Sequence, residues 1–104
     1  MCRLSMARLD SIREIEVADE LFAALAHPMR RQILLSIHLR GTAKAGDIAA
    51  RFDCSWPTTS RHLATLVESG LLSVEKQGRE RVYTTNSDLL SGMLRRWADY
   101  FGAD

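Results

Sequence analysis

The sequence has 104 residues, of which 46% are hydrophobic and 26% are charged, and its formal net charge is +1. This length and composition predict one folded domain, residues 1–104, and exclude a disordered or fibrous protein. No apolar run approaches the roughly 20 residues of a membrane-spanning helix, and residues 1–10 lack the apolar core of a secretion signal. With Cys2 and Cys54 as its two cysteines, the chain is expected to be cytoplasmic, with reduced thiols and no membrane partner.

Charge is distributed unevenly along the chain. Residues 27–84 contain nine Lys or Arg and five Asp or Glu and so carry +4, whereas residues 1–26 carry −2 and residues 85–104 carry −1. A basic middle between mildly acidic ends is typical of a protein that presents one face to nucleic-acid phosphates while its ends have another role.

The first part of the chain predicts two successive helices. Apolar residues recur at helical spacing over about 10–26, which indicates the first helix. The residue before a proline avoids the helical conformation, whereas proline itself suits the first turn of a helix. The His27-Pro28 step is therefore expected to end the first helix and begin the second, and Gly41 is expected to end the second.

A short helix and a longer one are predicted next. Thr42 or a neighbour can cap the short helix, over about 44–52. Ser55 is a good N-cap for the longer helix, Pro57 suits its first turn, and Gly70 is expected to end it. Helical spacing predicts that Thr59, Leu63, Leu66 and Val67 point inward and that Trp56, Thr58, Arg61, His62 and Thr65 lie outward or at the margin.

The last third of the chain predicts a hairpin and a final helix. β-prone residues at about 71–76 and 81–85 flank the polar segment 77–80, as in a two-stranded hairpin. Asn86-Ser87-Asp88 is a strong helix-start signal for a helix over about 87–101. The predicted fold is mainly α with a small β-hairpin, in the order α-α-α-α-β-β-α, which is the order of a winged helix-turn-helix.

Two short helices joined by the turn Asp53-Cys54-Ser55 have the layout of a helix-turn-helix. The second helix would fit the DNA major groove, where hydroxyl and guanidinium groups contact base edges or phosphates, and the basic hairpin could reach the flanking backbone. The alternative is an ordinary amphipathic helix followed by a solvated loop. For double-stranded DNA as the partner, the candidate contacts are Ser55, Trp56, Thr58, Thr59, Ser60, Arg61 and His62 on the helix and Lys76, Arg79 and Arg81 on the hairpin.

Three segments carry a family resemblance: FAALAHPMRRQILL at 22–35, CSWPTTSRHLATLVESGLL at 54–72 and GRERVYT at 78–84. In these segments the chain resembles the ArsR family of bacterial winged-helix repressors. Trp56 and Thr59 stand where a Gln and a Val are common in the family, so no base preference is carried over. The resemblance implies a DNA-binding repressor that has Ser55, Thr58, Ser60, Arg61 and His62 on its recognition motif and Arg79 on its wing.

The resemblance also implies a homodimer formed through the first and last helices, about 10–26 and 87–101. Large apolar residues support this expectation because the last helix carries more of them than one small domain readily buries. Their alternative role is to cover the core of their own chain. A two-fold dimer would match a palindromic operator. The predicted interface residues are Ile12, Ile15, Leu90, Met93, Leu94, Trp97 and Phe101.

No metal site or cofactor is predicted. Many ArsR relatives sense metals through a Cys-x-Cys pair before the recognition helix or through ligands on the last helix, but residues 45–50 read AGDIAA and the last helix has neither His nor Cys. Cys54 adjoins the start of the recognition helix and is a candidate redox residue, the alternative being a small buried turn residue. A regulatory protein partner or autoregulation is therefore favoured over a metal- or thiol-responsive repressor.

Two other functional classes compete with the repressor. An enzyme is not expected, because the chain lacks paired acids and a phosphate-binding glycine loop, and the neighbours in Ser60-Arg61-His62 point about 100° apart on a helix and cannot form a relay. A winged-helix module that binds proteins is the alternative to the repressor, since the net charge is low. DNA affinity that falls steeply with salt would distinguish the repressor from this module.

Overall fold

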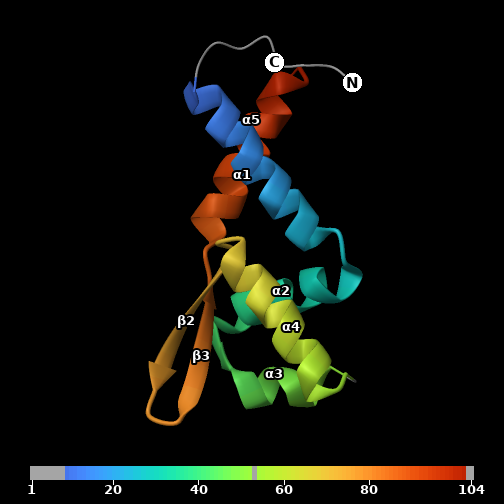
Figure 1. The fold of residues 1–104 in the computed structure, drawn as a ribbon, viewed down its shortest axis with the longest axis vertical. Coiled ribbons are helices and arrows are strands. Elements are labelled where there is room, and N and C mark those ends of the chain that lie inside the picture. The colour runs from blue at the N-terminus through green and yellow to red at the C-terminus, as the bar shows by residue number, and fades with distance from the viewer. Residues whose placement is uncertain (1–8, 53, 103–104) are drawn as a thin grey trace.

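The computed structural model describes residues 9–52 and 54–102, with side chains from residue 13 onward. Within this part, no helix is both long enough and apolar enough to cross a membrane. The elements, labelled in Figure 1, are α1 (Leu9–Leu25), α2 (Pro28–Arg40), β1 (Thr42–Lys44), α3 (Ala45–Arg51), α4 (Trp56–Glu68), β2 (Leu72–Gln77), β3 (Glu80–Thr85) and α5 (Ser87–Tyr100).

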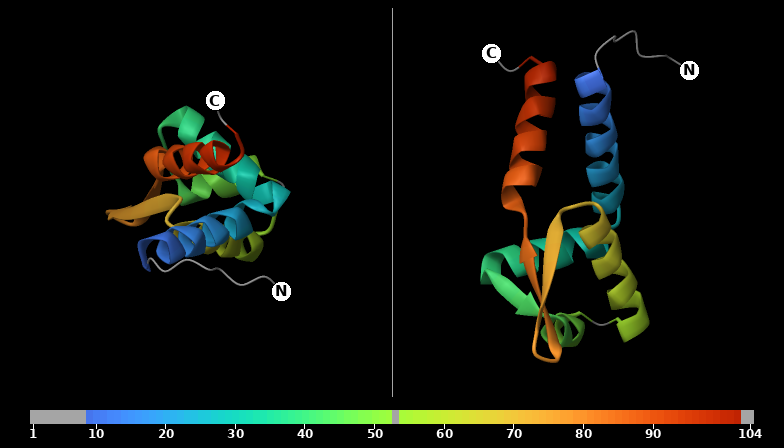
Figure 2. Two further views of the ribbon diagram at one scale, coloured as in Figure 1. Left: turned by 90° about the horizontal axis from the view of Figure 1, so that it is seen from above. Right: turned by 60° about the vertical axis from the view of Figure 1, so that its left-hand side comes forward.

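The elements form two regions. Helices α2, α3 and α4 and the sheet make a body, from which α1 and α5 project side by side (Figure 2). The five predicted helices and the hairpin are confirmed, in the predicted order. The hairpin of β2 and β3, residues 72–85, is the wing, and α4 is the second helix of the helix-turn-helix. Because the hairpin follows α4 directly, the wing and α4 belong to the same body.

The structure adds a short strand that the sequence pattern did not predict. Thr42, which was predicted together with its neighbours as a candidate cap for α3, lies instead in β1 and pairs with Thr84, and the antiparallel sheet has the order β1-β3-β2. Lys44 occupies the N-cap of α3 and its side chain makes no capping hydrogen bond. A three-residue strand has no periodicity to detect, and its hydrogen-bond partners lie about forty residues away, so only the tertiary fold specifies it.

The hairpin turn is tighter than predicted. Gln77 and Glu80 are paired strand residues, which leaves Gly78 and Arg79 as the whole turn. Gly78 has a φ of +65°, and a glycine with positive φ at the first central position is typical of two-residue hairpin turns. This turn places Arg79 at the tip of the wing.

Local signals determine where the helices begin and end. The Ser55 hydroxyl accepts a hydrogen bond from the Thr58 amide at 3.4 Å, as expected of an N-cap. At the other end of α4, Leu71 N donates to Leu66 O at 3.1 Å and Gly70 N donates to Val67 O at 3.0 Å, which is the Schellman pattern. Gly70 has a φ of +91°, and a Cβ at this position would lie 3.1 Å from Leu89, so glycine suits it for two separate reasons.

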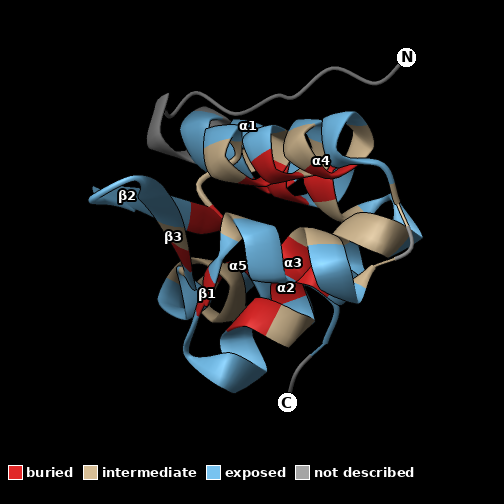
Figure 3. Ribbon diagram, turned by 90° about the horizontal axis from the view of Figure 1, so that it is seen from below, coloured by how far each residue is buried: buried red, intermediate tan, exposed pale blue. Residues whose placement is uncertain are grey.

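The core lies where α2, α3, α4 and the sheet meet (Figure 3) and continues toward α1 and α5. The inward prediction for α4 is confirmed for Thr59, Leu63 and Leu66, which are buried, and Val67 is half-buried. Burying one face of α4 in this way leaves its opposite face at the surface. The other buried apolar residues are Ala18, Leu21, Ala24, Ile33, Leu34, Ile37, Ala43, Ile48, Leu71, Leu72, Tyr83 and Met93.

Candidate nucleic-acid interface

The outer face of α4 presents side chains able to contact DNA. Trp56 is 46% exposed, Arg61 is exposed, and Thr58 and Ser60 are half-buried. Ser55 Oγ donates to Thr58 Oγ1 at 3.1 Å, so the two hydroxyls at the start of α4 are held together. Hydroxyls, an indole and a guanidinium at the start and along the exposed side of α4 form a surface suited to base edges and phosphates.

Thr59 does not belong to this surface. Its side chain is fully buried on the opposite face of α4, so its inclusion among the predicted DNA contacts is wrong. The reason is helical geometry, because Thr59 lies one turn before the buried Leu63 and shares its face. Thr59 Oγ1 is also buried without a hydrogen-bond partner.

The Thr59→Val variant is expected to be at least as stable as the native protein. Valine has nearly the same shape and removes an unpaired buried hydroxyl, whose burial costs on the order of 1 kcal/mol. Urea unfolding of the two proteins measures the difference in unfolding free energy. A variant less stable by about 1 kcal/mol or more would show that Oγ1 has a partner, such as a bound water.

His62 lies at the contact between α4 and the start of α2. Its ring is half-buried, its centroid is 4.5 Å from that of His27, and its Nδ1 lies 3.5 Å from Arg30 Nη1. His27 itself caps α2, since its Nδ1 accepts from Met29 N at 3.0 Å. His62 therefore packs α4 against α2, and a contact from it to DNA stays a prediction.

The surroundings of His62 make the protonated ring unfavourable. Burial, and then the nearby charges of His27, Arg30 and Arg61, lower the pKa of His62 from its ordinary 6.5. The unfolded chain therefore binds this proton more readily than the folded chain. Stability from this residue is complete above about pH 6.5 and is lost as the pH falls toward the lowered pKa of the folded state.

Replacing His62 with Gln is consequently expected to reduce the acid sensitivity of the protein. Urea unfolding at about pH 7.5 and about pH 5.5 should show a smaller fall in unfolding free energy for the variant than for the native chain. Comparing the two proteins cancels the titration of the other groups. An identical fall in both would mean that His62 has the same pKa folded and unfolded.

The wing carries an unusual pair of like charges. Lys76 on β2 is directly opposite Arg81 on β3, both side chains are exposed, and Arg79 is exposed at the tip. Like charges directly opposite each other on neighbouring strands destabilise a sheet. A bound anion such as a phosphate would relieve this repulsion, so the placement favours a role in binding over a role in folding.

A groove joins the wing to α4. It is lined by Trp56, by Arg79 and Arg81 of the wing, and by the start of α3. Lys44 and Glu80 also line this groove. Lys44 Nζ lies 3.1 Å from Glu80 Oε1, and this ion pair connects β1 to the wing. The start of α4 and the basic tip of the wing thus line the same groove and form one continuous surface.

Two arginines of the basic middle have an internal role that the sequence pattern does not reveal. Arg30 donates to the carbonyl oxygens of Ala24 at 2.6 Å and Ala23 at 3.1 Å, and Arg31 donates to that of Leu25 at 2.7 Å. These carbonyls end α1, where cations are favoured. Charge counted along the chain therefore overstates the positive charge available to DNA, and no local pattern distinguishes a capping arginine from a free one.

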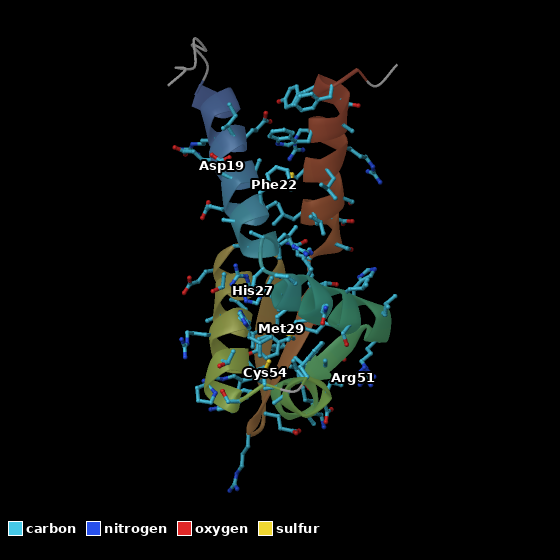
Figure 4. All side chains as sticks on the ribbon, turned by 90° about the vertical axis from the view of Figure 1, so that its right-hand side faces the viewer. Asp19, Phe22, His27, Met29, Arg51 and Cys54 are labelled. Carbon is cyan, nitrogen blue, oxygen red and sulfur yellow. The ribbon has the colours of Figure 1, made fainter. Side chains whose placement is uncertain are left out.

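The projecting helices meet through aromatic rings. Phe22 points from α1 toward α5 (Figure 4), where its ring centroid lies 5.1 Å from that of Trp97. The ring centroid of Trp97 also lies 5.4 Å from that of Phe101 and 6.4 Å from that of Tyr100. Phe101 is 74% exposed and Tyr100 is 65% exposed, so much of this aromatic cluster faces outward in the single chain.

The other predicted interface residues differ in exposure. Leu94 is exposed, whereas Ile15 and Leu90 are half-buried. Met93 is only 2% exposed and packs in the core of its own chain, so its prediction as a contact with a second copy is wrong. The side chain of Ile12 lies outside the described residues.

Cys54 is a half-buried free cysteine in the turn between α3 and α4. Its backbone N–H donates to Phe52 O at 2.7 Å, and its redox role stays a prediction. Cys2 lies outside the described residues. Over residues 13–52 and 54–102, no three His, Cys, Asp or Glu side chains gather in a group that could hold a metal ion.

Comparison with known proteins identifies relatives of this chain. Residues 25–75 match a family described as a helix-turn-helix domain. The transcriptional repressor SdpR of Bacillus subtilis is 35% identical over 76 residues, which cover 73% of this chain and 83% of SdpR.

Solved structures share the whole architecture. An ArsR-like transcriptional regulator from Rhodococcus sp. RHA1 superposes with a TM-score of 0.75 at 28% identity, over 83% of this chain and 80% of that one. A homodimeric winged helix-turn-helix DNA-binding domain from Mycobacterium bovis superposes with a TM-score of 0.68 at 22% identity, over 95% of this chain and 91% of the other. The predicted winged helix-turn-helix fold is confirmed.

Proposed function

Because the chain belongs to the ArsR family of helix-turn-helix transcriptional regulators, we propose that it is a repressor that binds a palindromic operator as a homodimer. The observation that carries this proposal is the continuous surface made by the exposed face of α4 and the wing, on which Lys76 and Arg81 stand opposite each other. A bound phosphate would offset the repulsion between these cations.

In the proposed complex, α4 lies in the major groove. Arg61 is the candidate for guanine or phosphate, and Trp56 offers an apolar edge to a thymine methyl group. The wing, with Arg79 at its tip, lies on the flanking backbone. A protein bound in this way at a promoter blocks access by RNA polymerase.

The homodimer is proposed to form through α1 and α5, which are the first and last helices of one domain. It is supported by the exposed Leu94 and Tyr100 on α5, by the exposed Phe101 directly after it, and by the projection of α1 and α5 from the body. The homodimeric neighbour from Mycobacterium bovis has the same fold. A two-fold dimer would place its two α4 helices in successive major grooves of a palindrome.

The test is a fluorescence-anisotropy titration of the protein against DNA from upstream of its own gene, with an unrelated duplex as competitor and a series of salt concentrations. Specific binding, two chains per site and a steep salt dependence are expected. Binding no tighter than to the unrelated duplex at every salt concentration would contradict autoregulation and favour a module that binds proteins.

The salt series also tests the wing. Arg79→Ala should weaken binding about equally for operator and unrelated DNA, because a phosphate contact carries no sequence information. The slope of log affinity against log salt should fall by roughly 1 for each phosphate contact that the substitution removes. An unchanged slope would mean that the tip of the wing does not contact the backbone.

A further inference from the structure

Helix α2 has apolar residues on two opposite sides, although only one of these sides packs into the core. Ile33, Leu34 and Ile37 are buried in the core, yet Leu35 is 57% exposed and Leu39 is 75% exposed. Leu35 and Leu39 are one helical turn apart and therefore share a face. A helix that is apolar on both sides is ordinarily covered on both sides.

These leucines line a groove between α2 and the end of α3. The half-buried Phe52 lines it on the α3 side, and Arg40 and Arg51 are also among its lining residues. Both arginines are exposed, and among the described residues that line the groove none is acidic. The groove therefore combines an apolar strip with a positive border.

The groove is separate from the surfaces assigned above. None of its lining residues lines the groove beside the wing, and none comes from α1 or α5. Leu35 alone also lines an apolar hollow against Leu90 and Leu94 of α5, and that hollow belongs with the proposed dimer surface. Figure 4 labels Arg51 on the body, away from the projecting helices.

We propose that this groove is a docking site for an acidic amphipathic helix of another protein. A short groove with two leucines at i and i+4 suits the apolar face of a helix laid across it. The positive border selects carboxylates on the flanks of that helix, and charge complementarity of this kind determines the choice of partner and the association rate. Phe52 ends α3 just before the turn to α4, so the partner would bind directly on the helix-turn-helix.

The experiment uses the full chain and two synthetic fluorescein-labelled peptides. Both are amphipathic helices with leucine at i, i+4 and i+7; one carries glutamate on its flanks and the other carries lysine at the same positions. Anisotropy should show the glutamate peptide binding at least about tenfold more tightly than the lysine peptide. The Leu35→Gln/Leu39→Gln double variant and Arg51→Glu should each weaken binding of the glutamate peptide by at least about tenfold. The control is Val74→Gln, which replaces an exposed apolar residue on β2 and should leave binding of this peptide unchanged.

Several outcomes would overturn the proposal. Absence of saturable binding by the glutamate peptide, or equal binding of both peptides, would exclude an acidic helix as the occupant. A double variant that becomes monomeric in sedimentation velocity would assign the leucines to a contact between copies of this chain. An Arg51→Glu variant that keeps the peptide and loses operator DNA would assign the arginine to the DNA surface. Operator binding by the native chain is measured separately, so failure of the repressor proposal is distinguished from failure of this one.

Discussion

Replacing Arg61 with Ala is expected to lower operator affinity about a hundredfold. The side chain is exposed on the outer face of α4, and removing an arginine that binds a base typically costs about 1–3 kcal/mol. A dimer carries this arginine twice, so about 1.4 kcal/mol from each copy gives two orders of magnitude. Fluorescence anisotropy at one fixed salt concentration measures the change.

The matched control is Arg95→Ala, which removes the same charge from an exposed position on α5. It should retain nearly native affinity, because α5 projects away from the start of α4 and the tip of the wing. For Arg61→Ala, the ratio of the affinity for the operator to the affinity for an unrelated duplex should also decrease. If both variants bind the operator like the native chain, α4 does not enter the major groove through this face.

Replacing Trp97 with Ala is expected to dissociate the proposed dimer. Trp97 is half-buried and touches rings on both projecting helices, Phe22 on α1 and Phe101 at the end of α5. Truncating a fully buried aromatic side chain typically costs about 3–5 kcal/mol of unfolding free energy. For this half-buried ring we expect the packing between α1 and α5, which the proposed interface needs, to lose about 2 kcal/mol or more. Sedimentation velocity over a concentration series should show monomers at concentrations where the native chain is expected to sediment as the proposed dimer. Operator affinity should fall because each half-site is then bound independently.

Leu66→Ala separates dimerisation from general stability. Leu66 is fully buried in the body, outside the aromatic cluster, and its truncation should cost about 2–5 kcal/mol of unfolding free energy. While it remains folded, this variant should sediment as a dimer. A Trp97→Ala protein that remains dimeric at every concentration would place the interface elsewhere than on α1 and α5.

Features that depend on neighbouring residues were predictable. Pro28 begins α2, Ser55 caps α4 and Gly70 ends it as expected, because caps, proline and positive φ act within a few residues. Asn86 precedes α5 as predicted, but its side chain donates to Gly70 O at 3.3 Å instead of capping the helix. Even at a correctly placed boundary, the partner of a polar side chain was determined by a residue distant in sequence.

The candidate site was predicted less completely than the fold. Thr59 and Arg61 are two residues apart, yet one is buried and the other exposed, and helical periodicity alone separates them correctly. The role of His62 could not be foreseen, since its packing against His27 and Arg30 joins segments more than thirty residues apart. The same applies to Met93, which packs into the core instead of facing a second copy.

Local periodicity, capping and turn chemistry were enough to specify the order of the elements, most of their boundaries, the winged helix-turn-helix class and the basic character of the wing. Three features are determined only by the tertiary structure. These are the strand β1, the hydrogen bonds from Arg30 and Arg31 to the carbonyl oxygens at the end of α1, and the exposure of Leu35 and Leu39. The reason is that exposure and hydrogen-bond pairing are set by contacts between distant segments, and these contacts form only when the whole core packs.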